Sequence, residues 1–219
     1  NEYRMKIAID GTAASGKGTL SENLSKKLKL PRLDTGLLYR RLAFMYLKSS
    51  KLIPIQNTID NSILESILND FDVNDLEPET LKQDLYGNFA SRIGKLDFVR
   101  NKLKIIQIEF VENMIRKKGG CILDGRDIGT EILPNADFKF YIDAPIGARA
   151  KRRFDQLYST NKSIKFKNIL LDLKKRDISD KSRKNSPLIL SEDSIFIDTE
   201  FLNPQKVLRK ALYYIKKNK

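Results

Sequence analysis

The first thirty residues pass from a short apolar run to a helical repeat. Ile7–Ile9 is wholly apolar and predicts a buried strand. Leu20, Leu24 and Leu28 recur at helical spacing and predict an amphipathic helix, which Pro31 ends. The pattern therefore predicts a strand, a loop and a helix in that order.

The same alternation continues along the rest of the chain. Because helical repeats separate the apolar runs, we expect a parallel sheet covered on both faces, which is a three-layer α/β/α core. The expected strands are 121–123, 138–142 and 195–197, and residues 33–36 are expected to form a short strand and turn. The expected helices are 37–47, 97–117, 146–157, 168–176 and one beginning after Asn203 and Pro204.

Two of these helices have well-defined apolar faces. In the helix over 97–117 we expect the buried stripe to be Val99, Leu103, Ile106, Phe110 and Met114. In the last helix we expect the core face to be Val207, Leu208, Ala211, Leu212 and Ile215.

Residues 49–95 interrupt the alternation. Pro54, Pro78 and many Asn and Asp residues leave only short apolar stretches there. We interpret 49–95 as an inserted mobile lobe, with 1–48 and 96–219 forming the core domain. A second polar interruption, approximately 157–167, is a candidate lid.

The loop after the first strand has the composition of a phosphate-binding loop. Glycines allow a tight turn whose N–H groups face one anion, while Lys17 and the N-terminal dipole of the following helix add positive charge. This is a P-loop NTPase-type arrangement, and the alternative is a glycine-rich turn that binds nothing. The loop residues are Gly11, Thr12, Ala13, Ala14, Ser15, Gly16, Lys17, Gly18 and Thr19. Gly18 stands where a Ser or Thr usually follows the lysine, and Thr19 supplies the hydroxyl one residue later.

The composition restricts the possible chemistry. The 219 residues include no histidine, which excludes histidine bases, histidine-containing hydrolase triads and histidine-ligated metals. Phosphoryl transfer needs little beyond Lys, Arg, Asp and a metal ion, because it depends on positioning and on spreading negative charge. The single cysteine, Cys121, excludes an intrachain disulfide and a cysteine-cluster metal site.

The chain shows no membrane signal. No apolar run approaches the ~18 residues that span a bilayer, and the first residues lack the apolar segment of a signal peptide. We expect a cytoplasmic protein, monomeric by default, in which residues 1–4 are a short extension before Met5. A net charge of +13 raises nucleic-acid binding as an alternative, but the scattered lysines and the Lys216–Lys219 tail favour a solvated surface.

One acidic residue is a candidate partner for a metal ion. Asp124 follows an apolar strand, at the position where P-loop proteins keep the acid that orients magnesium-bound water. The alternative is an acidic turn residue, because Asp-Gly is also a common turn pair.

Two arginine groups are candidates for binding phosphate. Arg176, Asp180 and Arg183 lie at helical offsets and share one face, where they could converge on a ligand. The alternative is an exposed, salt-bridged helix end. A second group, Arg149, Arg152 and Arg153, is either a solvated helix face or part of a lid that excludes water from a phosphoryl group.

Four sequence blocks together carry a family resemblance. They are Ile9-Asp-Gly11 with its Gly-Lys-Gly-Thr loop, Leu33-Asp-Thr-Gly-Leu-Leu-Tyr-Arg40, Leu123-Asp-Gly-Arg-Asp-Ile-Gly129, and Arg176-Asp-x-x-Asp-x-x-Arg183 followed by Ser186-Pro187-Leu188. In this order they resemble the bacterial cytidylate kinases. The resemblance implies transfer of the γ-phosphate of ATP to CMP or dCMP, with Mg²⁺, by a core with an NMP-binding lobe and a lid.

The resemblance also implies residue roles. Thr35, Arg40, Arg126 and Arg183 would hold the acceptor phosphate, and Tyr39 would pack in the acceptor pocket. Ser91, Arg100 and Asp127 would read the cytosine edge, and Arg176 and Asp180 would contact the sugar. Lys17 would bridge the β- and γ-phosphates of ATP, Arg152 and Arg153 would act from the lid, and Mg²⁺ would be held through water and phosphates with Asp124 nearby. The residues expected to be catalytic are Lys17, Asp124, Arg126, Arg152 and Arg176.

The sequence departs from the family pattern in two places. The phosphate loop has Thr12 where the family usually has proline, and Ala14 where it usually has glycine. The chain also looks shorter between Phe71 and Thr80 than family members that carry a long β-ribbon there. Two rival functions stay open, namely a kinase for another nucleotide or small molecule, and a nucleic-acid-binding protein that only senses NTP.

Overall fold

The computed structural model describes residues 4–49, 59–73, 78–81 and 83–217. By internal contacts the chain divides into two units, the first formed by Asn1–Leu33 with Asn113–Lys219 and the second by Asp34–Glu112. The domain boundaries expected from the sequence, with a core of 1–48 and 96–219 and an inserted lobe of 49–95, stay a prediction. Residues 1–3 of the expected extension before Met5, residues 218–219 of the lysine tail and residues 74–77 of the shortened segment after Phe71 lie outside the described residues.

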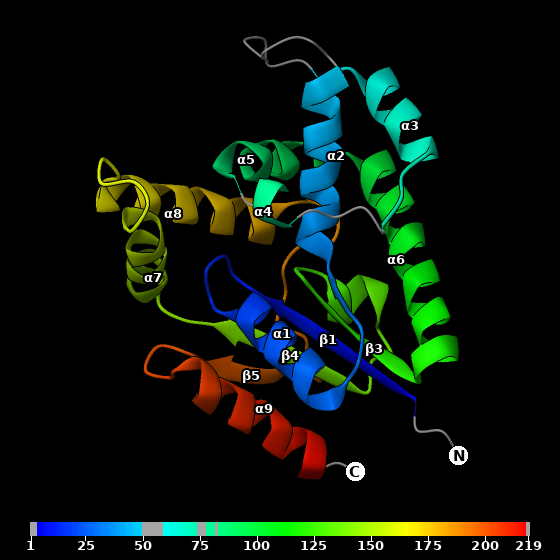
Figure 1. The fold of residues 1–219 in the computed structure, drawn as a ribbon, viewed down its shortest axis with the longest axis vertical. Helices are drawn as coiled ribbons and strands as arrows, with labels where there is room; N and C mark the ends of the chain where they lie inside the picture. Colours follow the sequence, from blue (N-terminus) through cyan, green and yellow to red (C-terminus); the bar gives the residue numbers. More distant parts are fainter. Residues whose placement is uncertain (1–3, 50–58, 74–77, 82, 218–219) are drawn as a thin grey trace. The chain divides into compact units, whose positions relative to one another are not determined.

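The first unit contains a five-stranded sheet in the order β2-β3-β1-β4-β5 (Figure 1). The strands are β1 (Met5–Gly11), β2 (Arg32–Asp34), β3 (Gly120–Gly125), β4 (Phe138–Asp143) and β5 (Ile195–Asp198). Strand β1 pairs in parallel with both β3 and β4, and β4 pairs in parallel with β5. The α/β class predicted from the sequence is therefore confirmed, and the carboxyl ends of four strands meet at one edge.

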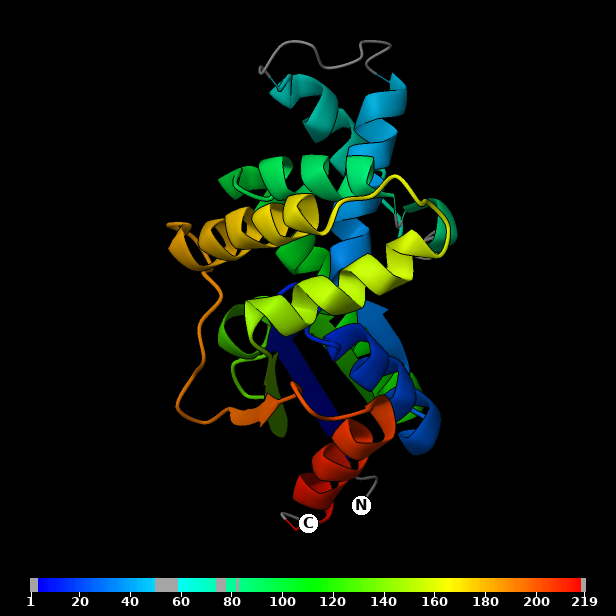
Figure 2. The same cartoon turned by 90° about the vertical axis from the view of Figure 1, so that its left-hand side faces the viewer.

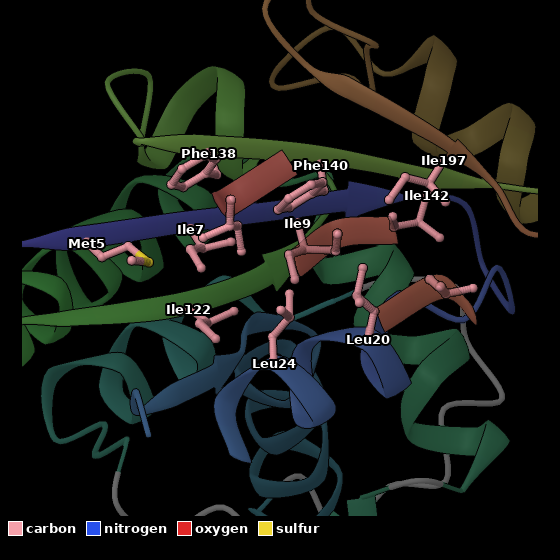
Figure 3. Packing of buried hydrophobic residues seen from close by; sticks show 13 residues of the cluster. Met5, Ile7, Ile9, Leu20, Leu24, Ile122, Phe138, Phe140, Ile142 and Ile197 are labelled. Atoms are coloured by element: carbon pink, nitrogen blue, oxygen red, sulfur yellow. The ribbon is translucent and has the colours of Figure 1, made fainter. Parts of the chain in front are cut away.

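Two helices cover one face of this sheet. Leu20 and Leu24 of α1 (Lys17–Leu28) point toward the strand side chains (Figure 3), and α9 (Pro204–Lys217) packs beside α1. Both predicted apolar stripes are confirmed, because Leu20, Leu24, Val207, Ala211 and Ile215 are buried and Leu28, Leu208 and Leu212 pack against them. Asn203 caps α9 by accepting a hydrogen bond from the Lys206 N–H at 2.9 Å.

The thiol of Cys121 is buried in this sheet, and burial raises its pKa to about 12.

A second apolar cluster joins the phosphate loop to two further helices. Helices α7 (Ile146–Tyr158) and α8 (Phe166–Ser182) pack against each other (Figures 1 and 2). Their contact includes Ala150, Ile169 and Leu173, together with Ala13 of the loop. The sequence analysis was wrong about the end of α8, which continues through residues 177–182 instead of stopping at 176.

The second unit is helical. It contains α2 (Thr35–Ser49), α3 (Asn61–Asn69), α4 (Pro78–Leu81), α5 (Asp84–Ile93) and most of α6 (Asp97–Lys118). Helices α3, α4 and α5 pack on α2, where the rings of Tyr46 and Phe89 stack 5.1 Å apart. Helix α5 was missed because its Gly87 weakens a helical pattern. The position favours glycine because a Cβ there would lie 2.6 Å from the guanidinium of Arg40.

The buried stripe of α6 differs from the predicted one. Val99 and Leu103 are buried as expected, but the stripe continues through Gln107 and Val111. A buried amide is tolerated here because the Gln107 side chain donates to the Leu103 carbonyl oxygen at 2.9 Å. Within the described ranges, no helix is both long and apolar enough to cross a membrane.

The end of β1 gives a stability prediction with a matched control. A Cβ at Gly11 would lie 2.0 Å from the carbonyl oxygen of Ile142, whereas a Cβ at Gly147 would meet nothing within 4 Å. We expect Gly11→Ala to cost at least ~3 kcal/mol of unfolding free energy. We expect Gly147→Ala to be neutral or to add roughly 0.5 kcal/mol, because alanine favours helix. Urea unfolding measures both, and equal effects would contradict the steric explanation.

Candidate active site

The backbone between β1 and α1 has the shape of an anion cradle. Gly16, which precedes α1, has a φ of 95° and offers no side-chain cap to the helix. No side chain of the cap residue bonds to the first turn, and the helix dipole favours negative charge there. Lys17 opens the helix and is partly exposed. These features fit the phosphates of a nucleotide, as the sequence predicts.

The carbonyl groups of the loop accept hydrogen bonds from within the loop and from other parts of the first unit. Ser15 Oγ donates to the Thr12 carbonyl at 2.9 Å, and Thr199 Oγ1 donates to the Ser15 carbonyl at 2.9 Å. The Ala13 carbonyl accepts from Arg149 Nη1 at 3.1 Å. Sequence reasoning missed Thr199, because it follows the last strand and lies far from the loop along the chain.

Asp124 is buried at the carboxyl end of β3. Its carboxylate accepts a hydrogen bond from Ser21 Oγ and forms an ion pair with Arg32, whose Nε lies 3.0 Å away. Asp124 is therefore tied to α1, immediately behind the phosphate loop. Its predicted role beside a magnesium-bound water stays a prediction.

The donor set fits a magnesium ion held mainly by phosphate oxygens and water. Within the described part of the chain, no group of three His, Cys, Asp or Glu side chains could form a metal cage. Mg²⁺ commonly keeps several waters and binds one or two carboxylates together with substrate phosphates. The indirect binding of Mg²⁺ expected from the sequence stays a prediction.

Charged side chains from two motifs converge on Asp180. Arg126 Nε lies 2.8 Å from one carboxylate oxygen of Asp180, and Arg183 Nη1 lies 3.7 Å from the other. Burial opposes ionisation of Asp180, but the charges of Arg126, Arg176 and Arg183 and the Arg126 hydrogen bond lower its pKa below the ordinary value. The structure thus brings together Arg126, Arg176 and Arg183, three of the arginines that the sequence analysis singled out.

The segment that follows α8 orients the side chain of Arg183. Its Nε donates to the Ser186 carbonyl at 2.6 Å, and its Nη2 lies 4.0 Å from Asp127 Oδ1. Ser186 has a φ of 51°, an unusual conformation for a residue with a side chain. The Leu188 N–H closes the turn by donating to the Asp180 carbonyl at 2.8 Å. The Ser-Pro-Leu part of the motif therefore positions Arg183, a role that the sequence analysis did not assign.

Asp10 is a further site residue that sequence reasoning missed. Its buried carboxylate accepts from the N–H groups of Ile128 at 2.8 Å and Gly129 at 2.7 Å. These residues begin a short π-helical turn, η1 (Ile128–Ile132), directly after Asp127. Burial raises the pKa of Asp10 to about 6, although the two N–H bonds act in the opposite direction. The Ile-Asp-Gly block contained this signal, since the acid follows a wholly apolar strand.

Arg149 of α7 does not belong to a solvated helix face. Arg149 is 3% exposed and pairs with Asp177 of α8 at 2.5 Å. Arg152 donates to the carbonyl groups of Thr199 and Glu200. The alternative of a solvated helix face is therefore wrong for Arg149, while the roles proposed for Arg152 and Arg153 toward ATP stay predictions.

The second unit brings together some of the remaining candidates. The Arg100 guanidinium lies 5.7 Å from the Tyr39 ring centroid and donates to the Gly94 carbonyl at 3.1 Å. Ser91 is partly exposed on α5, and Thr35 is buried at the start of α2.

Arg40 donates hydrogen bonds to backbone carbonyl groups within the second unit. Its Nη1 donates to the carbonyl groups of Leu81 at 2.8 Å and Gln83 at 2.9 Å. These bonds join α2 to the ends of α4 and α5. The role of Arg40 toward an acceptor phosphate stays a prediction.

The fold and the loop define an α/β protein of the P-loop type. A model of the cytidylate kinase family matches residues 7–217. The cytidylate kinase of Caldicellulosiruptor saccharolyticus is 36% identical over 219 residues, covering 95% of this chain and 94% of that protein. That of Bartonella bacilliformis is 38% identical over 205 residues, covering 94% and 91%. The chain belongs to the cytidylate kinase family.

Solved structures share the fold at low sequence identity. An uncharacterized protein from Eubacterium ventriosum has a TM-score of 0.54 at 14% identity, covering 97% of this chain and 99% of that chain. A sugar kinase from Janibacter has a TM-score of 0.51 at 13% identity, covering 97% and 95%. At this identity the similarity concerns the fold alone.

The buried carboxyl group of Asp10 predicts a pH-dependent stability. Its pKa of about 6 lies above the ordinary 3.8, so the native state binds this proton more tightly than the unfolded state. The resulting stabilisation is complete below the ordinary pKa and is lost as the pH rises through about 6. The stability of the wild type relative to Asp10→Asn should therefore fall by ~3 kcal/mol between pH 3.5 and 7. Urea unfolding across this range measures it, and a constant difference would contradict the prediction.

Proposed function

We propose that this chain transfers the γ-phosphoryl group of ATP to CMP or dCMP and so forms CDP or dCDP. The observation that carries the proposal is an uncapped α1 N-terminus behind a glycine-rich loop, in a chain that matches the cytidylate kinase family over residues 7–217. The curated relatives of similar length support the same reaction.

The first unit supplies the groups that bind the donor. Loop N–H groups and Lys17 bind the β- and γ-phosphates of ATP, and Asp124 lies behind them at the end of β3. Mg²⁺, held by phosphate oxygens and water, supplies further positive charge to the transferring phosphoryl group. The reaction needs no protein nucleophile, because an oxygen of the acceptor phosphate attacks the γ-phosphorus and ADP leaves.

The arginine cluster around Asp180 supports binding of an acceptor phosphate. Arg126 and Arg183 can donate paired hydrogen bonds to phosphate oxygens, and Arg176 adds charge nearby. Asp180 partly balances these charges and can accept a hydrogen bond from a sugar hydroxyl. Fixed donors offset the repulsion between two polyanions that must approach each other.

Asp127 supports selection of an amino-bearing base. Its carboxylate accepts hydrogen bonds, so it can accept from the exocyclic amine of cytosine. Uracil presents a carbonyl oxygen at that position, and two acceptors facing each other are unfavourable. In the second unit, Arg100 and Tyr39 are the corresponding candidates for contact with a base.

The rival functions make different predictions. A kinase for another nucleotide would not prefer cytosine, and an NTP-sensing nucleic-acid-binding protein would show salt-sensitive binding of DNA or RNA with little turnover.

A monomeric state and a cytoplasmic location remain predictions from the sequence.

The substrate proposal predicts a clear order of acceptors. With ATP and Mg²⁺, we expect the purified protein to convert CMP and dCMP well ahead of UMP, AMP and GMP. Chromatographic identification of the diphosphate formed, together with a coupled assay of ADP release, measures the order. UMP turnover equal to that of CMP would overturn the assignment of Asp127.

The donor site predicts a large effect at Lys17. Lys17→Ala should leave no more than a few per cent of kcat while the circular dichroism spectrum is unchanged, because the β- and γ-phosphates lose a fixed charge. Lys26→Ala is the matched control on the same helix, since Lys26 is exposed and pairs with the exposed Glu22 at 2.6 Å. It should keep its activity and lose at most ~0.5 kcal/mol of stability. Substantial activity in Lys17→Ala would exclude the proposed role.

A further inference from the structure

Arg149 joins three parts of the first unit. From α7, its Nε donates to the Ala144 carbonyl at 2.7 Å, at the end of β4. Its Nη1 donates to the Ala13 carbonyl of the phosphate loop, and its Nη2 lies 2.5 Å from Asp177 Oδ2 on α8. A guanidinium that is 3% exposed is costly to bury unless its donors are satisfied, and these partners supply acceptors on three sides.

The contact with Ala13 fixes the direction of a loop N–H group. In a trans peptide the carbonyl and the following N–H point in opposite directions, and the described residues contain no cis peptide. When the Ala13 carbonyl faces Arg149, the Ala14 N–H must face the other way. The Thr199 bond to the Ser15 carbonyl orients the Gly16 N–H in the same manner.

The loop of this chain needs such support because of its sequence. Ala14 has a φ of 60°, which is unfavourable for a residue with a Cβ, and it stands where the family usually has glycine. Thr12 stands where the family usually has a proline, which would restrict the backbone. Here Thr12 Oγ1 instead donates to Asp143 Oδ1 at 2.5 Å, and Asp143 lies 3.6 Å from Arg149 Nε.

We propose that Arg149 is a positioning residue that holds the strained phosphate loop in its anion-binding conformation from the side opposite the N–H groups. Through Asp177 it also links the loop to α8, the helix that carries Arg176 and Asp180. This proposal depends on the proposed phosphoryl transfer only where KM values are measured, because binding of an anion to the loop needs no catalysis.

Binding of inorganic tripolyphosphate tests the loop separately from catalysis. Arg149→Lys keeps a charge beside Asp177, but an ammonium group cannot reproduce the fork of the guanidinium. We expect its Kd for tripolyphosphate, measured by calorimetry, to rise about tenfold, the effect of one charge-assisted hydrogen bond. Lys151→Met is the matched control, because Lys151 lies on the same helix and pairs with Asp155 at the surface. It should bind as the wild type does.

The link to α8 has its own readout. Asp177→Asn keeps the Arg149 bond to Ala13, so its tripolyphosphate Kd should stay within about twofold of the wild type. Its KM for CMP should rise more than its KM for ATP, because α8 carries the acceptor-side cluster. Equal changes in the two KM values would overturn this part of the proposal.

A double-mutant cycle with Ala14→Gly tests whether Arg149 acts through the strained loop. Glycine adopts the φ of 60° without steric cost, so the loss caused by Arg149→Lys should shrink from about tenfold to about threefold in the Ala14→Gly background. Thr12→Val, which removes only the bond to Asp143, gives a second cycle if Arg149→Lys does not fold.

The outcomes of these measurements separate the two proposals. An unchanged Kd in Arg149→Lys, or an equal loss in both backgrounds, overturns the positioning role. A wild-type protein that binds tripolyphosphate but forms no CDP overturns the proposed function and leaves the positioning role standing.

Discussion

The placement of β1 between two parallel neighbours determines where the first unit can bind anions. Asp10 is in register with Gly125 of β3 and with Tyr141 of β4, and Gly11 pairs with Ile142. The backbones approach so closely at Gly11 that no side chain fits there. The loop after β1 and the acids at the carboxyl ends of β3 and β4 must therefore lie at the same edge of the sheet.

Acidic side chains at this edge support the groups that would contact phosphate. Asp10 holds the start of η1, Asp124 holds α1 through Ser21, and Asp143 holds Thr12 of the loop. Each carboxylate accepts hydrogen bonds from donor groups of buried residues. The same arrangement keeps a strongly basic region stable before a ligand arrives, because Asp180 and Asp127 partly offset the charge of the arginines around them.

Sequence reasoning could predict the parts of this structure that depend on local pattern. The strand before the loop, the leucine stripe of α1 and the Asn203 cap of α9 follow from spacing and capping chemistry, and the structure has all three. Helix α5 and the continuation of the α6 stripe through Gln107 were missed. In both, a residue that weakens the local pattern is accommodated by a contact, Arg40 beside Gly87 and the Leu103 carbonyl beside Gln107.

The candidate site shows the same limit more sharply. Helical offsets could place Arg176, Asp180 and Arg183 on one face, but they could not show that Arg126, 54 residues away from Asp180, completes the cluster. Helical offsets also could not show which arginine of α7 is buried. The burial of Arg149 depends on Ala13, 136 residues earlier, and on Asp177, 28 residues later. A charged helix face in a sequence is therefore ambiguous until its long-range acceptors are known. Because buried guanidinium groups require such acceptors, carbonyl groups turned outward from a binding loop are the natural place to look for them.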